Sequence, residues 1–217
     1  MNNYSQIENK FLHSGYVIKK AEKNSALNYI RDSIKKRIIQ ESNLKRRNLK
    51  NFSFNALHNF VSIKDLNRIR LKLFNDINKD KKFRNNFFLI AKNTLFSIVG
   101  NELAMQNKIN LSIQFPNDAS SLLPLHSDRW DGDSPFESVL WLPLVNCFKS
   151  KSMFILNSSK YEKFRKIYKK RKIKTVSHLH NTLKKDLDFI KINYGNFLLF
   201  NQNLPHGNIV NKTARQE

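Results

Sequence analysis

Three side chains have the types and the spacing of metal ligands. His126 and Asp128 lie two positions apart in a segment expected to be extended, where alternate side chains point to the same face. The imidazole and the carboxylate can therefore reach one point. His206 lies far downstream, after the apolar run 197–200. Two histidines and one carboxylate can hold a divalent metal ion on one face and leave its other positions open.

This donor set is the facial triad of non-haem Fe(II) oxygenases. Both histidines lie within two positions of Pro or Gly at expected strand edges, where the mouth of a barrel would be. Arg215 follows His206, and its guanidinium is suited to bind the far carboxylate of a dicarboxylate in bidentate fashion. The alternative is coincidence, because an H-x-D tripeptide often arises by chance and a single histidine after a strand is often structural.

The order of expected elements is helices first and short strands afterwards. Helical spacing of apolar residues predicts helices over 26–39 and 63–77, the second begun by a capping box at Ser62–Asp65, and a further helix capped by Asp80 and ended by Gly100. Strands are expected over 109–115, 122–130, 138–145, 152–157, 189–193, 196–200 and 207–210. The layout predicts an α+β chain, with a helical region at 1–108 and a β-sandwich or barrel at 109–217 that carries a basic helical insertion near 160–185.

Composition limits the class of protein. The 217 residues include 39 Lys and Arg against 17 Asp and Glu, a formal charge of +22, and 40% are hydrophobic, which is enough for a packed core. The apolar runs are too short to span a bilayer, and the first residues lack the pattern of a signal peptide, so we expect a cytoplasmic protein without a membrane span. Cys147 is the only cysteine, which excludes an intrachain disulfide.

Several motifs in order resemble a known family. The segments that carry the resemblance are 121–128, Trp130, 132–137, 141–145, 151–153, 204–208 and Asn211. Together they resemble the Fe(II)/2-oxoglutarate-dependent oxygenases, and most closely the bacterial sporadic carbohydrate cluster 2OG-Fe(II) oxygenases. The resemblance covers about residues 109–217, and the first half of the chain contributes no diagnostic motif.

The resemblance implies a fold, a cofactor and a reaction. It implies N-terminal helices packed on a double-stranded β-helix (jelly-roll) core, with Fe(II) bound by His126, Asp128 and His206. It implies that 2-oxoglutarate and O₂ are consumed, giving succinate, CO₂ and a hydroxylated small metabolite, which the family's setting suggests is carbohydrate-related. Arg215 is the expected partner of the 2-oxoglutarate C5 carboxylate, and Gln114 is a second candidate for cosubstrate binding. Because the family continues into a further strand, we expect the last strand to be missing after Glu217.

Four residues are candidates for substrate binding, and each has a structural alternative. Trp130 and Phe136 can stack on a sugar or belong to the core, while Asp133 can bind hydroxyl groups or form a turn, and Lys151 can face the site or end a turn. Two other functions stay open. The charge of +22 would suit a nucleic-acid-directed 2-oxoglutarate oxygenase, and the early end of the chain would suit a catalytically inactive, cupin-like binding protein. The sequence does not define the substrate, the regiochemistry or the oligomeric state.

Overall fold

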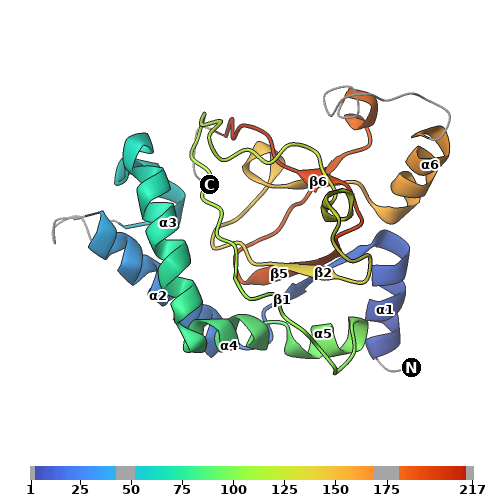
Figure 1. The fold of residues 1–217 in the computed structure, drawn as a ribbon, viewed down its shortest axis with the longest axis horizontal. Coiled ribbons are helices and arrows are strands. Elements are labelled where there is room, and N and C mark those ends of the chain that lie inside the picture. The colour runs from blue at the N-terminus through green and yellow to red at the C-terminus, as the bar shows by residue number, and fades with distance from the viewer. Residues whose placement is uncertain (1–2, 43–51, 169–180, 214–217) are drawn as a thin grey trace.

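The computed structural model describes residues 3–42, 52–168 and 181–213, which form a mixed fold of helices and small antiparallel sheets (Figure 1). The helices are α1 (Asn3–Ser14), α2 (Asn24–Glu41), α3 (Ile63–Lys79), α4 (Lys81–Leu89), α5 (Lys92–Ile98) and α6 (Ser158–Tyr168), with 3-10 turns η2 (Phe54–Asn59), η3 (Asp128–Asp131) and η4 (Lys149–Lys151). The strands are β1 (Tyr16–Lys20), β2 (Ser138–Trp141), β3 (Phe154–Ile155), β4 (Asp188–Phe189), β5 (Asn196–Asn201) and β6 (His206–Gly207). The α+β class is confirmed. None of the described helices is long and apolar enough to cross a membrane.

Helix α3 follows from local signals in the sequence. Ser62 precedes it, and its hydroxyl accepts a hydrogen bond from the backbone N–H of Asp65 at 3.2 Å, which satisfies one of the first-turn donors. One stripe of the helix is buried, as its apolar spacing predicts. The buried residues are Leu66, Ile69, Leu73 and Ile77.

The single helix expected from Asp80 to Gly100 is two helices. The chain breaks between α4 and α5, where Ala91 has φ −133° and ψ 17°. The carboxylate of Glu22 accepts hydrogen bonds from the backbone N–H groups of Asn93 and Thr94 at 2.7 and 2.9 Å, which satisfies the first turn of α5. The expectation of one helix is wrong because this cap comes from a residue far away in the sequence.

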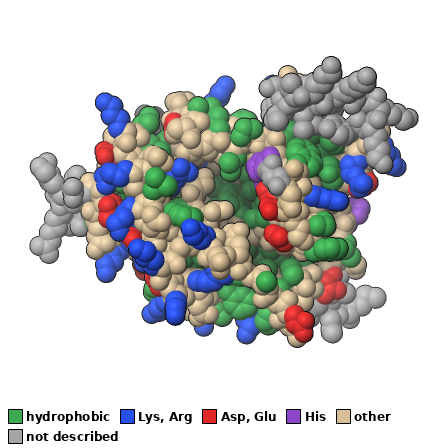
Figure 2. All heavy atoms as spheres, in the orientation of Figure 1, with side chains coloured by type: hydrophobic (Ala, Val, Ile, Leu, Met, Phe, Trp, Pro, Cys, Tyr) green, Lys and Arg blue, Asp and Glu red, His purple; other side chains and the backbone are tan. Residues whose placement is uncertain are grey.

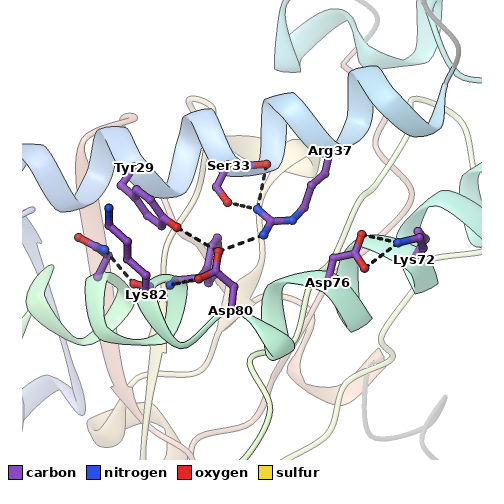
Figure 3. A network of polar contacts seen from close by, with 9 residues as sticks. Tyr29, Ser33, Arg37, Lys72, Asp76, Asp80 and Lys82 are labelled. Atoms are coloured by element: carbon purple, nitrogen blue, oxygen red, sulfur yellow. Dashed lines mark hydrogen bonds and ion pairs between the residues drawn. The ribbon is translucent and has the colours of Figure 1, made fainter.

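Asp80 connects α2 to the start of α4 (Figure 3). Its carboxylate accepts hydrogen bonds from the Phe83 backbone N–H at 3.1 Å, from the Tyr29 hydroxyl at 3.0 Å and from the Arg37 guanidinium at 3.0 Å. Burial by itself raises the pKa of Asp80, but these three donors and the charge of Arg37 outweigh it and hold the pKa below its ordinary value. The ionised carboxylate therefore holds these helices together.

The first sheet has the strand order β1-β5-β2, and both pairings are antiparallel. Its central strand β5 is buried on both faces. Phe197 and Leu199 join the large core formed with the helices, whereas Leu198 and Phe200 join a second cluster together with Ile155 of β3. Because β1 comes from the N-terminal region, the first hundred residues are not helical throughout.

The second sheet has the order β4-β3-β6 and lies across the Leu198–Phe200 cluster from the first. The described residues therefore form two sheets of three strands each, and they do not show a double-stranded β-helix. Segments 109–115 and 122–130, expected as strands, form no ladder. At Ile109 the side chain of Asn78 takes the place of a neighbouring strand, since it both donates to and accepts from this backbone, at 3.0 and 2.7 Å.

The basic insertion is helical in its first part. Helix α6 occupies Ser158–Tyr168, and Lys160 forms an ion pair with Asp188 at 2.9 Å. Residues 169–180 of the expected insertion lie outside the described residues, as do Arg215 and the end of the chain, where the missing strand was expected.

Candidate metal centre

The two histidines face each other across a pair of backbone hydrogen bonds. The N–H of His126 donates to the carbonyl oxygen of His206 at 3.0 Å, and the N–H of His206 donates to the carbonyl oxygen of His126 at 2.7 Å. Residues paired in this way in antiparallel chains project their side chains to the same face. The imidazole rings accordingly lie 4.4 Å apart between centroids. This pairing brings together two ligands that are far apart in the sequence.

Asp128 joins them because Ser127 is extended. Ser127 has φ −131° and ψ 133°, so the side chains before and after it point to one side, as the spacing predicted. The chain then turns into η3 at Asp128, so the expected strand ends there. Ser127 itself is fully buried, and its hydroxyl donates to the carbonyl oxygens of Gln202 and Asn203, both at 3.1 Å. This contact fixes the segment that bears two ligands against the loop that leads to the third.

The ring orientations suit metal binding through Nε2. Nδ1 of His126 lies 2.7 Å from the carbonyl oxygen of Pro124, and Nδ1 of His206 lies 2.9 Å from that of Leu204. A carbonyl oxygen only accepts, so each Nδ1 carries a proton and each Nε2 is the nitrogen that can bind a metal ion. Such Nδ1 contacts are the usual way in which proteins orient metal-binding histidines.

The three candidate ligand atoms lie close together. Nε2 of His126 and Nε2 of His206 are 3.5 and 3.8 Å from Oδ1 of Asp128, and all ligand atoms of the group lie within 4.8 Å of one another. Two ligands at right angles with bonds of ~2.1 Å would be ~3 Å apart, so small movements would close the group around an ion. The side chains of His126 and Asp128 are 27% and 23% exposed, which leaves one side of the group open.

The electrostatics of the group match a cation site. Burial lowers the pKa of His206 below its ordinary value, although the Leu204 carbonyl and Asp128 act in the opposite direction. Burial by itself raises the pKa of Asp128, but in the metal-free group the hydrogen bond from His126 and the charges of the protonated histidines outweigh it, so the net pKa is lowered. A bound metal ion would take the place of these protons. A neutral imidazole and an ionised carboxylate are the protonation states that a metal ion requires.

Gly207 allows the two ligand segments to approach each other. A Cβ at this position would lie 2.7 Å from the carbonyl oxygen of Leu123, 2.9 Å from that of Pro124 and 2.8 Å from the Phe154 ring. These contacts are too short for any real Cβ, and two of them are with backbone. The two segments are also joined by a hydrogen bond, in which the backbone N–H of Asn208 donates to the carbonyl oxygen of Leu123 at 2.9 Å. Glycine at 207 is therefore a requirement of the site geometry.

Gln114 and Lys151 make their side-chain hydrogen bonds to residues outside the triad. Gln114 donates to the carbonyl oxygen of Ile209 at 2.6 Å, and Lys151 donates to Oδ1 of Asn55 at 2.6 Å. Both side chains are thus used in holding segments together, and their functional roles stay predictions. Arg215 lies outside the described residues.

Three of the four predicted substrate residues, Trp130, Asp133 and Phe136, lie on the segment that follows Asp128. Trp130 is 45% exposed and Phe136 is 89% exposed, so the alternative that they are core residues is wrong. Asp133 is also exposed. Figure 2 shows histidine and acidic side chains together at the rim of a hollow with an apolar floor. These positions leave the three side chains available to a ligand.

Sequence reasoning missed how this segment is anchored. The side-chain amide of Gln202 donates to the carbonyl oxygen of Ser134, and that of Asn203 donates to the carbonyl oxygen of Pro135 at 2.8 Å. Both amides belong to the loop before His206, so the loop that carries the distal ligand also holds the segment that carries the exposed aromatic residues. The available signal was a run of three polar residues at 201–203, where β5 ends and the loop begins.

Comparison of the sequence with known proteins does not assign the chain to a family. No protein-family model matches the chain, and a search of curated proteins finds no significant match. The class supported by the fold and the site alone is therefore an α+β protein with a candidate two-histidine, one-carboxylate metal centre.

Proposed function

We propose that the protein is an Fe(II)- and 2-oxoglutarate-dependent oxygenase that hydroxylates a small, carbohydrate-related metabolite in the cytoplasm. The single observation that carries this proposal is the triad itself. His126 and His206 are paired through their backbones. Ser127 is extended, so Asp128 points to the same side as His126. Two histidines and one carboxylate with open positions are the donor set of non-haem Fe(II) oxygenases.

The residues of the centre fit an iron ion in charge and in orientation. His126, Asp128 and His206 would hold Fe(II), with both Nδ1 protons on backbone carbonyls and both Nε2 atoms directed to the Asp128 side. Bound Fe(II), with 2-oxoglutarate and O₂, supplies the oxidising chemistry that hydroxylates carbon and yields succinate and CO₂. The protein's part is to orient Nε2 of both histidines through their Nδ1 contacts, to hold the aspartate ionised and to orient both substrates.

The arrangement of the sheets supports a jelly-roll relationship. Two small antiparallel sheets share the apolar cluster between Ile155 and Leu198, and the triad lies at the edge of one of them. Facing sheets with a site at one end are the general plan of double-stranded β-helix proteins. In this proposal Arg215 binds the C5 carboxylate of 2-oxoglutarate, Gln114 assists it, and Trp130, Asp133, Phe136 and Lys151 contact the substrate.

The charge distribution favours a small molecule over a nucleic acid. Residues 109–148 contain one basic residue, Arg129, and five acidic residues, although the whole chain has a formal charge of +22. The acidic residues are Asp118, Asp128, Asp131, Asp133 and Glu137. A nucleic-acid enzyme concentrates Lys and Arg around the site that receives the phosphate backbone. This segment has the opposite balance, so the basic surface of the chain and the proposed reaction are separate features.

Succinate formation tests the proposal. Purified protein with Fe(II), ascorbate, 2-oxoglutarate and O₂ should convert 2-oxoglutarate to succinate slowly without substrate, and faster with a suitable metabolite. Asp128→Ala should abolish this conversion, whereas Asp133→Asn, a matched change on the same segment, should retain the reaction without substrate. Metal binding without succinate formation would favour the inactive, cupin-like binding protein, and conversion that is unaffected by Asp128→Ala would refute the proposed centre.

A further inference from the structure

A second candidate binding site lies between α4 and α5, at the edge of the molecule away from β6 (Figure 1). An open cavity of about 440 Å³ is present there, within the size range of small-molecule sites. One wall is a single stripe of α4, because residues spaced by three and four positions share a helix face. The lining residues are Lys81, Arg84, Asn85, Phe88, Phe96, Asn101, Leu103 and Met105.

The two ends of this cavity differ in chemistry. Phe88 of α4 and Phe96 of α5 form the aromatic end, with ring centroids 6.0 Å apart and planes tilted by 54°. Phe96 is 37% exposed, so part of its ring is accessible to a ligand in the cavity. An aromatic ring that stays accessible beside another offers a surface on which a flat ligand can stack.

The other end carries positive charge. The Arg84 guanidinium is fixed by donating to the carbonyl oxygens of Met105 and Asn107 at 2.7 and 2.9 Å, so its position is set before any ligand arrives. Carbonyl oxygens do not neutralise its charge. Lys81 has no ion-pair partner among the described residues, and none of the residues that line the cavity is acidic. This end therefore favours an anionic group.

We propose that this cavity binds a small molecule that combines an aromatic ring system with a phosphate or carboxylate group, up to the size of a mononucleotide. The aromatic part packs on the exposed ring of Phe96, beside Phe88, and the anionic group contacts Lys81 in the field of Arg84. Side-chain amides at Asn85 and Asn101 supply hydrogen bonds to the polar edges of the ring system. Binding here does not require the metal centre.

Three probes separate the contributions of the two ends. Titration calorimetry with AMP, adenosine and ribose 5-phosphate should give measurable affinity for AMP, weaker affinity for adenosine and the weakest for ribose 5-phosphate. Lys81→Gln should weaken AMP binding at least about fivefold and leave adenosine unchanged, since it removes one charge-assisted contact. Phe96→Leu should weaken both AMP and adenosine.

Lys64→Gln is the matched control, because it removes the same charge from an exposed position on α3. Equal effects of Lys64→Gln and Lys81→Gln on AMP binding would show diffuse attraction to a cationic protein and would overturn the proposal. So would the absence of AMP binding, or AMP binding that Phe96→Leu leaves unchanged. Urea unfolding of each variant establishes that the exposed substitutions leave the fold intact.

Discussion

Gly207→Ala should weaken metal binding without removing a ligand. The new Cβ would lie 2.7 Å from the Leu123 carbonyl oxygen, where ordinary contact begins near 3.4 Å, so this backbone must retreat by about 0.7 Å. The same backbone continues to His126, whose pairing with His206 sets the distance between the two imidazoles. Functional sites tolerate displacements of only about 0.5 Å. We expect a loss of about 1–3 kcal/mol in stability and a loss of about tenfold or more in metal affinity.

Co(II), an air-stable substitute for Fe(II), allows the affinity to be measured from its visible absorbance, and urea unfolding of the metal-free protein gives the stability. Gly195→Ala is the matched control, because Gly195 has φ +93° and no atom within 4 Å of a new Cβ. It should lower stability through backbone strain and leave metal affinity unchanged. If Gly207→Ala binds Co(II) as tightly as the original protein does, the backbone pairing does not set the site.

Three further predictions concern the supports of the fold and the site. Ser127→Ala should cost about 1–2 kcal/mol, because it removes the buried hydroxyl that the carbonyl oxygens of Gln202 and Asn203 share. An unchanged urea unfolding curve would show that this contact does not stabilise the fold. Because the pKa of Asp80 is lowered in the folded state, its charge stabilises the protein above the ordinary aspartate pKa, and this contribution is lost as the pH falls through the lowered pKa. The difference in unfolding free energy between the original protein and Asp80→Asn should therefore shrink in acid, and a difference that is constant with pH would contradict the assignment. In a Trp141→Phe background, the fluorescence of Trp130 should be quenched more by caesium than by iodide, since the neighbouring residues are mainly acidic. Stronger quenching by iodide would indicate that the basic surface extends to the site.

The helices that are encoded locally were predictable from the sequence. For α3, the residues that form the cap at Ser62 and the buried stripe all lie in one short segment, and both predictions are confirmed. The break between α4 and α5 was not predictable, because it depends on Glu22, which lies about seventy positions away from the N–H groups that it binds. Local spacing identifies a helix, but it does not identify a cap that comes from another part of the fold.

The strands show the same limit more strongly. β3, β4 and β6 contain two residues each, which is too short to show an alternating pattern. Segment 109–115 alternates in part, yet the side chain of Asn78 takes the place of a neighbouring strand at Ile109. The pairing of His126 with Asp128 was predictable because they lie two positions apart and Ser127 between them is extended. The register that places His126 opposite His206 depends on tertiary contacts around Gly207, which residue spacing does not encode.

The most direct test of the proposed function is an anaerobic titration of the protein with Fe(II) and 2-oxoglutarate, followed by visible spectroscopy. If His126, Asp128 and His206 hold iron and leave positions open, a weak charge-transfer band should appear that requires both Fe(II) and 2-oxoglutarate. The band should be absent in Asp128→Ala and present in Asp133→Asn. A protein that shows no such band, or one whose band persists in Asp128→Ala, would contradict the assignment of this centre.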